Sequence, residues 1–444
     1  MTLLAIDWSG VFVKAGEFIL SFGILVILHE LGHFIPAKLF KCRVEKFYLF
    51  FNPWFSLWKK KKGETEYGIG WVPFGGYVKI AGMIDESMDK AQLNQPAQPW
   101  EFRSKPAWQR LIIMIGGVTV NVILAIVIFI MIMWVWGEEY LPVKNLTYGI
   151  YADSLAKQIG IKTGDNIVGI NGNPIENFNK LQTEIIVKEA KTLQVVRDGK
   201  AIDIAVPDGF INKLNKNKLD GFVEANFPTI VDSVMSEAVF TKGTLQKGDT
   251  IIGMNNEYYN NYYDFANARD LYKNKVVDLK VIRGKDSVTI SCLLKNGKVG
   301  FFPVTPDKMF GTEVKKYSFN QSVPVGFKKC FETLSGYIAG IKQAFKNPNE
   351  NLGSVISIGK IYPNVWNWQK FWTLTAIFSI ILAFMNILPI PALDGGHALF
   401  TIVEIVTGRK PSDKLMEYAQ MVGMVLLLSL MAYALGLDFM RLFR

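Results

Sequence analysis

Long apolar runs stand out at three places in the chain. Leu111–Trp136 has no charged residue over 26 positions, Phe371–Leu393 has none over 23, and Tyr418–Leu437 has none over 20. A helix of about 20 apolar residues crosses the hydrocarbon core of a bilayer. We therefore predict transmembrane helices at 111–136, 371–393 and 416–438.

A fourth apolar stretch, near the N-terminus, is interrupted by polar residues. Phe18–Leu28 is apolar, and the string His29-Glu30-Leu31-Gly32-His33 follows it directly. Such a stretch can be a secretory signal peptide, but Glu17 precedes the apolar core and no small-x-small cleavage site follows. We interpret residues 1–37 as a retained first transmembrane helix.

The region between the second and third predicted spans contains an internal repeat. Residues 164–172 (GDNIVGING) and 248–256 (GDTIIGMNN) share five identities at an offset of 84, and 195–197 and 281–283 match at an offset of 86. Turn residues around alternating apolar positions are typical of strands, and tandem similarity indicates repeated modules. We predict two strand-rich modules, at 144–226 and 227–300.

Residues 301–370, which follow the second module, contain a helical pattern. Large apolar side chains recur there at spacings of three and four, which is typical of one helix face: Phe327, Phe331, Leu334, Ile338, Ile341 and Phe345. Lysines and a glutamate occupy the other faces, so the helix is too charged to cross a membrane. We expect it to lie on the outer membrane surface or against the two modules.

The distribution of basic residues predicts how the chain is oriented in the membrane. Eight basic residues and one acid lie between Lys38 and Lys62, and three basic residues lie between the last two spans. Because basic loops stay in the cytoplasm, we expect cytoplasmic loops at 38–110 and 394–415 and both termini outside. These loops account for the net charge of +10, and nothing in the sequence suggests nucleic acid binding.

Composition agrees with a multi-pass α-helical membrane protein that has a large external part. Half of the 444 residues are hydrophobic. The three cysteines, Cys42, Cys292 and Cys330, are scattered and lack metal-ligand spacing. We interpret them as structural thiols, although the sequence leaves a disulfide between the last two open.

The histidines carry the candidate chemistry. His29 and His33 are four residues apart, so both imidazoles lie on one helix face and can bind one Zn²⁺, with Glu30 beside it as general base. An HExxH string can also arise by chance on a soluble helix. Ionisable residues at membrane depth cost about 2.5–3.5 kcal/mol each, however, which favours the catalytic interpretation.

A hydrolytic zinc ion takes three protein ligands and keeps one open position. Asp394 is the acid available at the end of the third span, and Pro389 and Pro391 break the helix ahead of it, so the chain can turn back towards the metal. We expect Asp394 to be the third ligand rather than an interfacial helix cap. His397, three residues further on, fits an interfacial residue better than a fourth ligand.

Two weaker signals lie in the second span. Gly116 and Gly117 suit close helix packing. Asn121, one turn further on, needs a polar partner inside the membrane, which the catalytic core can supply.

The motifs together resemble the site-2 protease family of zinc intramembrane metalloproteases. HExxH in the first span and the string N-x-x-P-x-P-x-L-D-G at 386–395 are that family's signature, and tandem modules between the second and third spans point to its RseP type. The module pattern L-x-x-G-D-x-I-x-x-[IV]-N-G resembles the circularly permuted PDZ domain of bacterial proteases, although no clear Gly-x-Gly-Phe carboxylate-binding loop is visible.

This resemblance implies roles for individual residues. His29, His33 and Asp394 would be the zinc ligands and Glu30 the catalytic acid and base. Asn386 and Pro389 would contact substrate. One departure is that 352–356 (LGSVI) replaces the Gly-Pro pair common before the third span.

Residues 66–82 (EYGIGWVPFGGYVKIAG) alternate strand-like residues with glycine and proline. A substrate helix must unwind to expose its carbonyl groups, and a strand beside the active site could pair with the freed backbone. The resemblance supports a membrane re-entrant β-loop here on the cytoplasmic side, with Gly75, Gly76 and Tyr77 near substrate. The alternative is a surface hairpin under the lipid headgroups.

We therefore predict an intramembrane zinc protease of a bacterial cytoplasmic membrane, with its PDZ domains on the periplasmic side and its active site near the cytoplasmic side. Its partners would be the lipid bilayer and single-span membrane proteins, anti-sigma factors or remnant signal peptides, that a first protease has already shortened. Two alternatives are a tandem-PDZ scaffold with a non-catalytic metal site and a zinc transporter. The retained Glu30 opposes the first, and the single polar cluster opposes the second.

Overall fold

The computed structural model describes residues 8–73, 75–83, 96–216, 222–235, 238–346 and 361–442. Segment 352–356, where the sequence departs from the family pattern, lies outside them. The chain forms two compact units, each described by itself below. The helical unit comprises the residues up to Gly137 and those from Lys316 onward, and the strand-rich unit is Glu138–Lys315.

Four helices of the described chain are long and apolar enough to cross a membrane. They are α1 (Trp8–Leu39), α3 (Ala107–Val135), α12 (Trp368–Ile387) and α14 (Asp413–Leu442). The predicted end of the third span at Leu393 was six residues too late. The helix ends at Ile387 because Pro389 and Pro391 cannot continue it.

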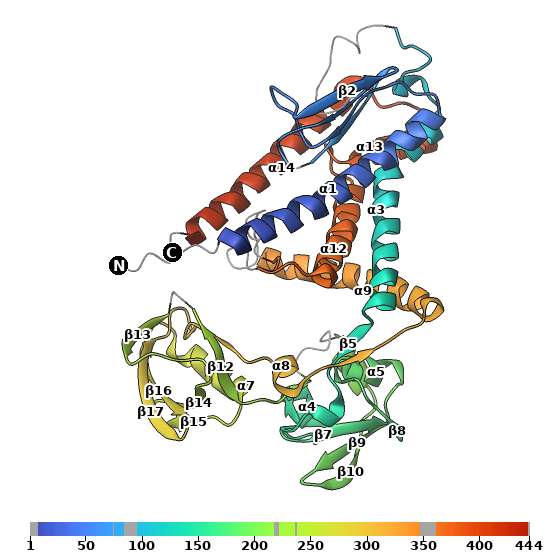
Figure 1. Ribbon diagram of the computed structural model, residues 1–444. Coiled ribbons are helices and arrows are strands. Elements are labelled where there is room, and N and C mark those ends of the chain that lie inside the picture. The colour runs from blue at the N-terminus through green and yellow to red at the C-terminus, as the bar shows by residue number, and fades with distance from the viewer. Residues whose placement is uncertain are drawn as a thin grey trace. The chain divides into compact units, whose positions relative to one another are not determined.

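Helix α3 contacts four other helices of this unit, α1, α9, α12 and α13 (Figure 1). At its crossing with α1, a Cβ added to Gly32 or Gly116 would overlap the carbonyl oxygen of the other residue, so the two backbones touch. This agrees with the packing predicted for Gly116.

The amphipathic helix is α9 (Phe319–Lys346). It packs on α3 and α12, where buried Cys330 shares a core with Ala125 and Ile380. A stripe of its apolar side chains stays exposed, as expected for a helix that touches lipid: Phe319, Val323, Phe327, Phe331 and Ile338. Cys42, Cys292 and Cys330 are all free and buried.

The predicted cytoplasmic loop 394–415 contains a helix that the sequence interpretation missed, α13 (Asp394–Thr407). At 14 residues it is too short to span. Ala398 and Thr401 are buried, whereas Leu399 and Ile402 are exposed. An ion pair of 2.5 Å between Arg110 and Glu404 joins α13 to the start of α3.

A four-stranded sheet follows α1, with the order β2-β3-β1-β4. Its strands are β1 (Val44–Leu49), β2 (Trp58–Lys62), β3 (Thr65–Ile69) and β4 (Tyr77–Ile80), and the short helix η1 (Phe102–Ser104) comes after them. The predicted β-loop 66–82 therefore supplies two strands that do not pair with each other. Both pair with β1, and β4 lies at the edge of the sheet within the described chain.

The strand-rich unit repeats one topology. Sheet order β10-β9-β7-β8 in the first half matches β17-β16-β14 with β15 in the second, and the pairing of β6 with β11 matches that of β12 with β18. Each half has its own hydrophobic core. The second module extends beyond its predicted end at 300, because β18 (Phe301–Pro303) pairs with β12.

The first half contains β5 (Glu138–Tyr140), η2 (Val143–Asn145), β6 (Ile150–Ala152), α4 (Ser154–Gln158), β7 (Asn166–Ile170), β8 (Asn173–Pro174), η3 (Phe178–Lys180), α5 (Leu181–Val187), β9 (Thr192–Arg197), β10 (Lys200–Ala205), α6 (Phe210–Lys216) and β11 (Val223–Ala225). The second half contains β12 (Thr229–Val234), β13 (Val239–Lys242), β14 (Thr250–Met254), β15 (Glu257–Tyr258), α7 (Tyr262–Arg269), η4 (Asp270–Tyr272), β16 (Val276–Arg283), β17 (Asp286–Leu293), β18, α8 (Pro306–Phe310) and β19 (Glu313–Lys315), which pairs with β5.

The sequence repeat marks an equivalent buried ion pair in each half. Arg197 donates to both carboxylate oxygens of Asp165 at 2.7 and 2.8 Å, and Arg283 does the same to Asp249 at 2.8 Å. Both aspartates are 1% exposed. The shared Gly-Asp and Val-x-Arg strings thus serve the fold of each module.

Candidate metal centre

The HExxH string lies within α1, which continues through it to Leu39. Four residues separate the two histidines, so both rings project from the same side of the helix. His33 is buried, and His29 and Glu30 are half-buried. All three line one cavity of about 610 Å³ in the helical unit.

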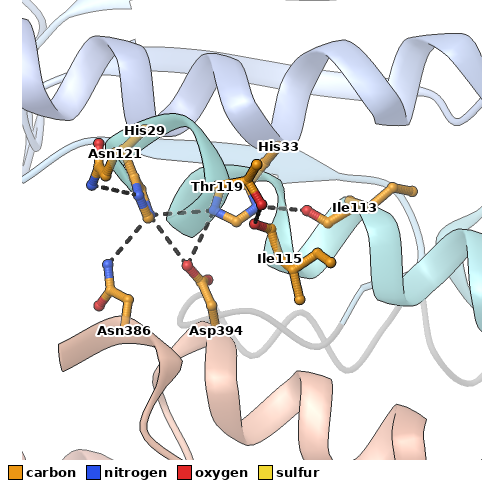
Figure 2. A network of polar contacts seen from close by, with 8 residues as sticks. All are labelled: His29, His33, Ile113, Ile115, Thr119, Asn121, Asn386 and Asp394. Atoms are coloured by element: carbon orange, nitrogen blue, oxygen red, sulfur yellow. Dashed lines mark hydrogen bonds and ion pairs between the residues drawn. The ribbon is translucent and has the colours of Figure 1, made fainter. Parts of the chain in front are cut away.

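Asp394 reaches the histidines through an irregular segment. After α12 ends, Ala392 takes a positive φ of 78°, and Asp394 is the first residue of α13. Its Oδ2 lies 3.2 Å from Nε2 of His29 and 3.3 Å from Nε2 of His33, and the two Nε2 atoms are 3.3 Å apart (Figure 2). The structure therefore brings the three predicted ligands together.

These separations fit a zinc ion. In a tetrahedral site with bonds of about 2.0–2.1 Å, neighbouring ligand atoms lie about 3.3 Å apart. Two imidazole nitrogens and one carboxylate oxygen are also a usual donor set for catalytic zinc. Among the described residues, His29, His33 and Asp394 form the group of histidine, cysteine or acidic side chains that lie close enough together to hold one metal ion.

The second nitrogen of each imidazole is held by α3. His33 Nδ1 lies 2.8 Å from the carbonyl oxygen of Ile113, and because a carbonyl only accepts, this nitrogen carries the proton. Nε2 of neutral His33 is then the free ligand atom. His29 Nδ1 lies 3.2 Å from the side-chain amide nitrogen of Asn121, which is fully buried. When Nε2 of His29 binds a metal, Nδ1 carries the proton, so the Asn121 amide would then present its oxygen to Nδ1. Such partners fix ring orientation in metal sites.

Gly117 lies directly against the two rings. A Cβ added there would be 2.6 Å from His29 Cε1 and would overlap His33 Nε2. Only glycine leaves this space open. The sequence pointed to close packing at this position and to a polar partner for Asn121; it did not indicate the contact with the rings or the role of the Ile113 carbonyl, which no side-chain pattern encodes.

The remaining predicted site residues divide into two groups. Gly75, Gly76 and Tyr77 line the same cavity, and so does Asn386, whose amide nitrogen lies 3.5 Å from His29 Nε2. Pro389 is exposed and is not on the cavity wall, where Ala392 and Leu393 lie instead. His397 lines the cavity but is not in the metal-ligand group.

Comparison with known proteins identifies the family of the chain. The family model described as peptidase family M50 matches residues 17–430. A Vibrio cholerae protein named "Putative zinc metalloprotease" is 27% identical over 96% of this chain and 98% of its own length. The "Regulator of sigma E protease" of Haemophilus influenzae is 28% identical over the same shares, and a Clostridium perfringens protein with the first name is 27% identical over 93% of this chain and 94% of its own. On the extent of the family match, the chain belongs to peptidase family M50.

Proposed function

We propose that the protein is an intramembrane zinc metalloprotease that hydrolyses peptide bonds in or near the transmembrane segments of single-span proteins. Its cofactor is Zn²⁺, in keeping with its family and with the names of its relatives. His29, His33 and Asp394 are the proposed ligands. The observation that carries the proposal is the convergence of their three ligand atoms, 3.2–3.3 Å apart, beside Glu30 in one cavity.

Zinc, Glu30 and Asn386 have separate proposed roles in the reaction. A bound zinc ion supplies a Lewis acid and makes water at its open position more acidic. Glu30 takes the proton of the attacking water and later gives it to the leaving amine. The amide of Asn386, on the same cavity wall, donates a hydrogen bond to the carbonyl oxygen under attack.

Strand β4 is the proposed binding site for unwound substrate. It lines the cavity and, within the described chain, forms an edge of its sheet, where an added strand could pair with its backbone. A substrate paired in this way keeps its backbone groups satisfied where water is scarce. Gly75 and Gly76 let the segment pass close to Phe51 and to the Tyr48 carbonyl.

A comparison of two substrates distinguishes a role of β4 in substrate binding from a general loss of activity. Gly75→Ala should impair cleavage of a helical single-span substrate more than of the same sequence unwound by glycine and proline. Gly63→Ala is the matched control, because Gly63 has a positive φ, as Gly75 has, but lies in the turn between β2 and β3 with nothing within 4 Å of an added Cβ. Equal losses on both substrates would remove β4 from substrate binding.

The strand-rich unit is proposed to be two PDZ domains outside a bacterial cytoplasmic membrane that exclude substrates with bulky external parts. The duplicated topology supports tandem domains. A first protease would then have to shorten the substrate, an anti-sigma factor or a remnant signal peptide. Lengthening the external part of a model substrate should slow cleavage, and deleting Glu138–Lys315 should abolish that dependence.

The central test compares purified wild type with Glu30→Gln on a tagged single-span substrate in detergent, with zinc measured in both. We expect both proteins to hold zinc and only the wild type to cleave, with a loss of about 10²–10⁴-fold in the variant. Zinc in both and cleavage by neither would favour a scaffold, and zinc flux into vesicles without hydrolysis would favour a transporter.

A further inference from the structure

Helix α14 touches the rest of the helical unit along a narrow strip. Most of its apolar side chains are exposed, as expected for a helix surrounded by lipid. Among the α14 residues whose side chains are described, only Gln420, Gly423 and Leu437 are buried. A polar amide therefore occupies one of the few protected positions of an apolar helix.

The strip meets the segment that carries Asp394. A Cβ added to Gly423 would overlap the carbonyl oxygen of Pro391, so the α14 backbone touches this segment directly. Gln420 is three residues earlier, on the same helix face. It is the residue of α14 that, within the described chain, lines the cavity of His29, Glu30 and Asp394.

Gln420 is 5% exposed and makes no hydrogen bond with any described residue. Its side chain offers two N–H donors and one carbonyl acceptor. The amide therefore lies at the cavity wall with its hydrogen-bonding groups unused by the described residues. A partner that enters the cavity could pair with them.

We propose that Gln420 is a substrate-binding residue that pairs with the main chain of the unwound substrate; this rests on the proposed function. A peptide group presents one donor and one acceptor, which a glutamine side chain matches at once. Because the Gln420 amide is uncharged, it would not neutralise a charged group of the substrate. Phe22, Val26 and Leu382 line the same cavity and suit the apolar side chains of a transmembrane segment, whose backbone groups then remain to be paired.

The first experiment measures cleavage of a helical single-span substrate by wild type, Gln420→Met and Gln420→Asn, with zinc content and melting temperature determined for each. Methionine keeps the length of the side chain and removes its hydrogen bonds. We expect KM to rise about tenfold, the value of one or two hydrogen bonds, with zinc and melting temperature unchanged and partial recovery in Gln420→Asn. If wild type cleaves and Gln420→Met matches it, the inference fails and the proposed function stands.

A second experiment keeps the test valid if wild type does not cleave. A photo-crosslinking residue is placed at position 420 or at exposed Val422, in the Glu30→Gln background. Irradiation with the same substrate should give an adduct from position 420 and none from 422. No adduct from 420, or equal adducts from both positions, would overturn the inference.

Discussion

The helical unit and the strand-rich unit both bury polar side chains, but the surroundings of those side chains differ. In the strand-rich unit, Asp165 and Asp249 are each 1% exposed, and each receives two hydrogen bonds from an arginine of its own module. In the helical unit, His29, His33 and Asp394 point three lone-pair atoms at one place. Buried groups that satisfy one another serve the fold, whereas converging acceptors call for a cation.

The two units also differ in redundancy. The Asp–Arg pair occurs once in each module, and each module has its own hydrophobic core. Among the described residues the metal centre occurs once, and it takes its parts from α1, α3 and α13. A change at the metal centre should therefore abolish function, whereas a change in one module should stay local.

The largest expected effect comes from Gly117→Val. The added side chain overlaps the ring of His33 and displaces at least one imidazole. Activity should fall by about 10²-fold or more, since a misplacement of about 1 Å is enough for this, and zinc should be lost. Thr119→Val is the matched control, because Thr119 is exposed and differs little in shape from valine. If Gly117→Val held as much zinc as the wild type, the metal would have to bind at another place in the protein.

A smaller effect is expected from Asn121→Ala. The variant removes the side chain that lies 3.2 Å from His29 Nδ1 but leaves all three ligands in place. Loss of such a partner weakens metal binding by about 10–100-fold. Competition with a chelator of known zinc affinity measures the change. Unchanged affinity would mean that α12 and α13 alone orient the His29 ring.

The parts of this arrangement that the sequence predicted are those set by local pattern. The apolar runs gave the four spans, the HExxH spacing gave two ligands on one helix face, and the strings around Asp165 and Asp249 gave the modules. Helix α13 was missed because its 14 residues are too few to span a membrane, and because Asp394-Gly395-Gly396 at its start is typical of a turn.

Tertiary contacts could not be predicted. The place of Gly117 against the imidazoles and of β4 at the sheet edge depends on how separate segments meet. Pro389 shares a motif with Asp394, yet it is exposed, because a motif does not specify which side of an irregular segment faces the cavity. Gln420 was within reach of sequence reasoning, since it is a lone amide in an apolar span, as Asn121 is.

The smallest effect is expected from Asp249→Asn. Hydrogen bonds from Arg283 hold the pKa of Asp249 below its ordinary value. The ion pair of Asp249 with Arg283 therefore stabilises the folded state fully above about pH 4, the ordinary pKa of an aspartate. This stabilisation is lost as the pH falls through the lowered pKa of Asp249. The variant should lose about 1–3 kcal/mol at neutral pH, seen as faster amide exchange in β14 and β16 of the full-length protein.

Two variants complete this comparison. Asp286→Asn, at an exposed position, removes the same charge and should leave exchange unchanged. Asp165→Asn should speed exchange in β7 and β9 and spare the second module. Equal acceleration of both modules by either variant would contradict the separate cores.

X-ray absorption at the zinc edge, on purified wild type and on Asp394→Ala, tests the proposed metal centre most directly. For the wild type we predict one zinc per chain, with two imidazole nitrogens and carboxylate oxygen at about 2.0–2.1 Å. In Asp394→Ala the metal should be lost or the oxygen contribution altered. Sulfur neighbours at about 2.3 Å, or identical spectra from the two proteins, would contradict the assignment of His29, His33 and Asp394.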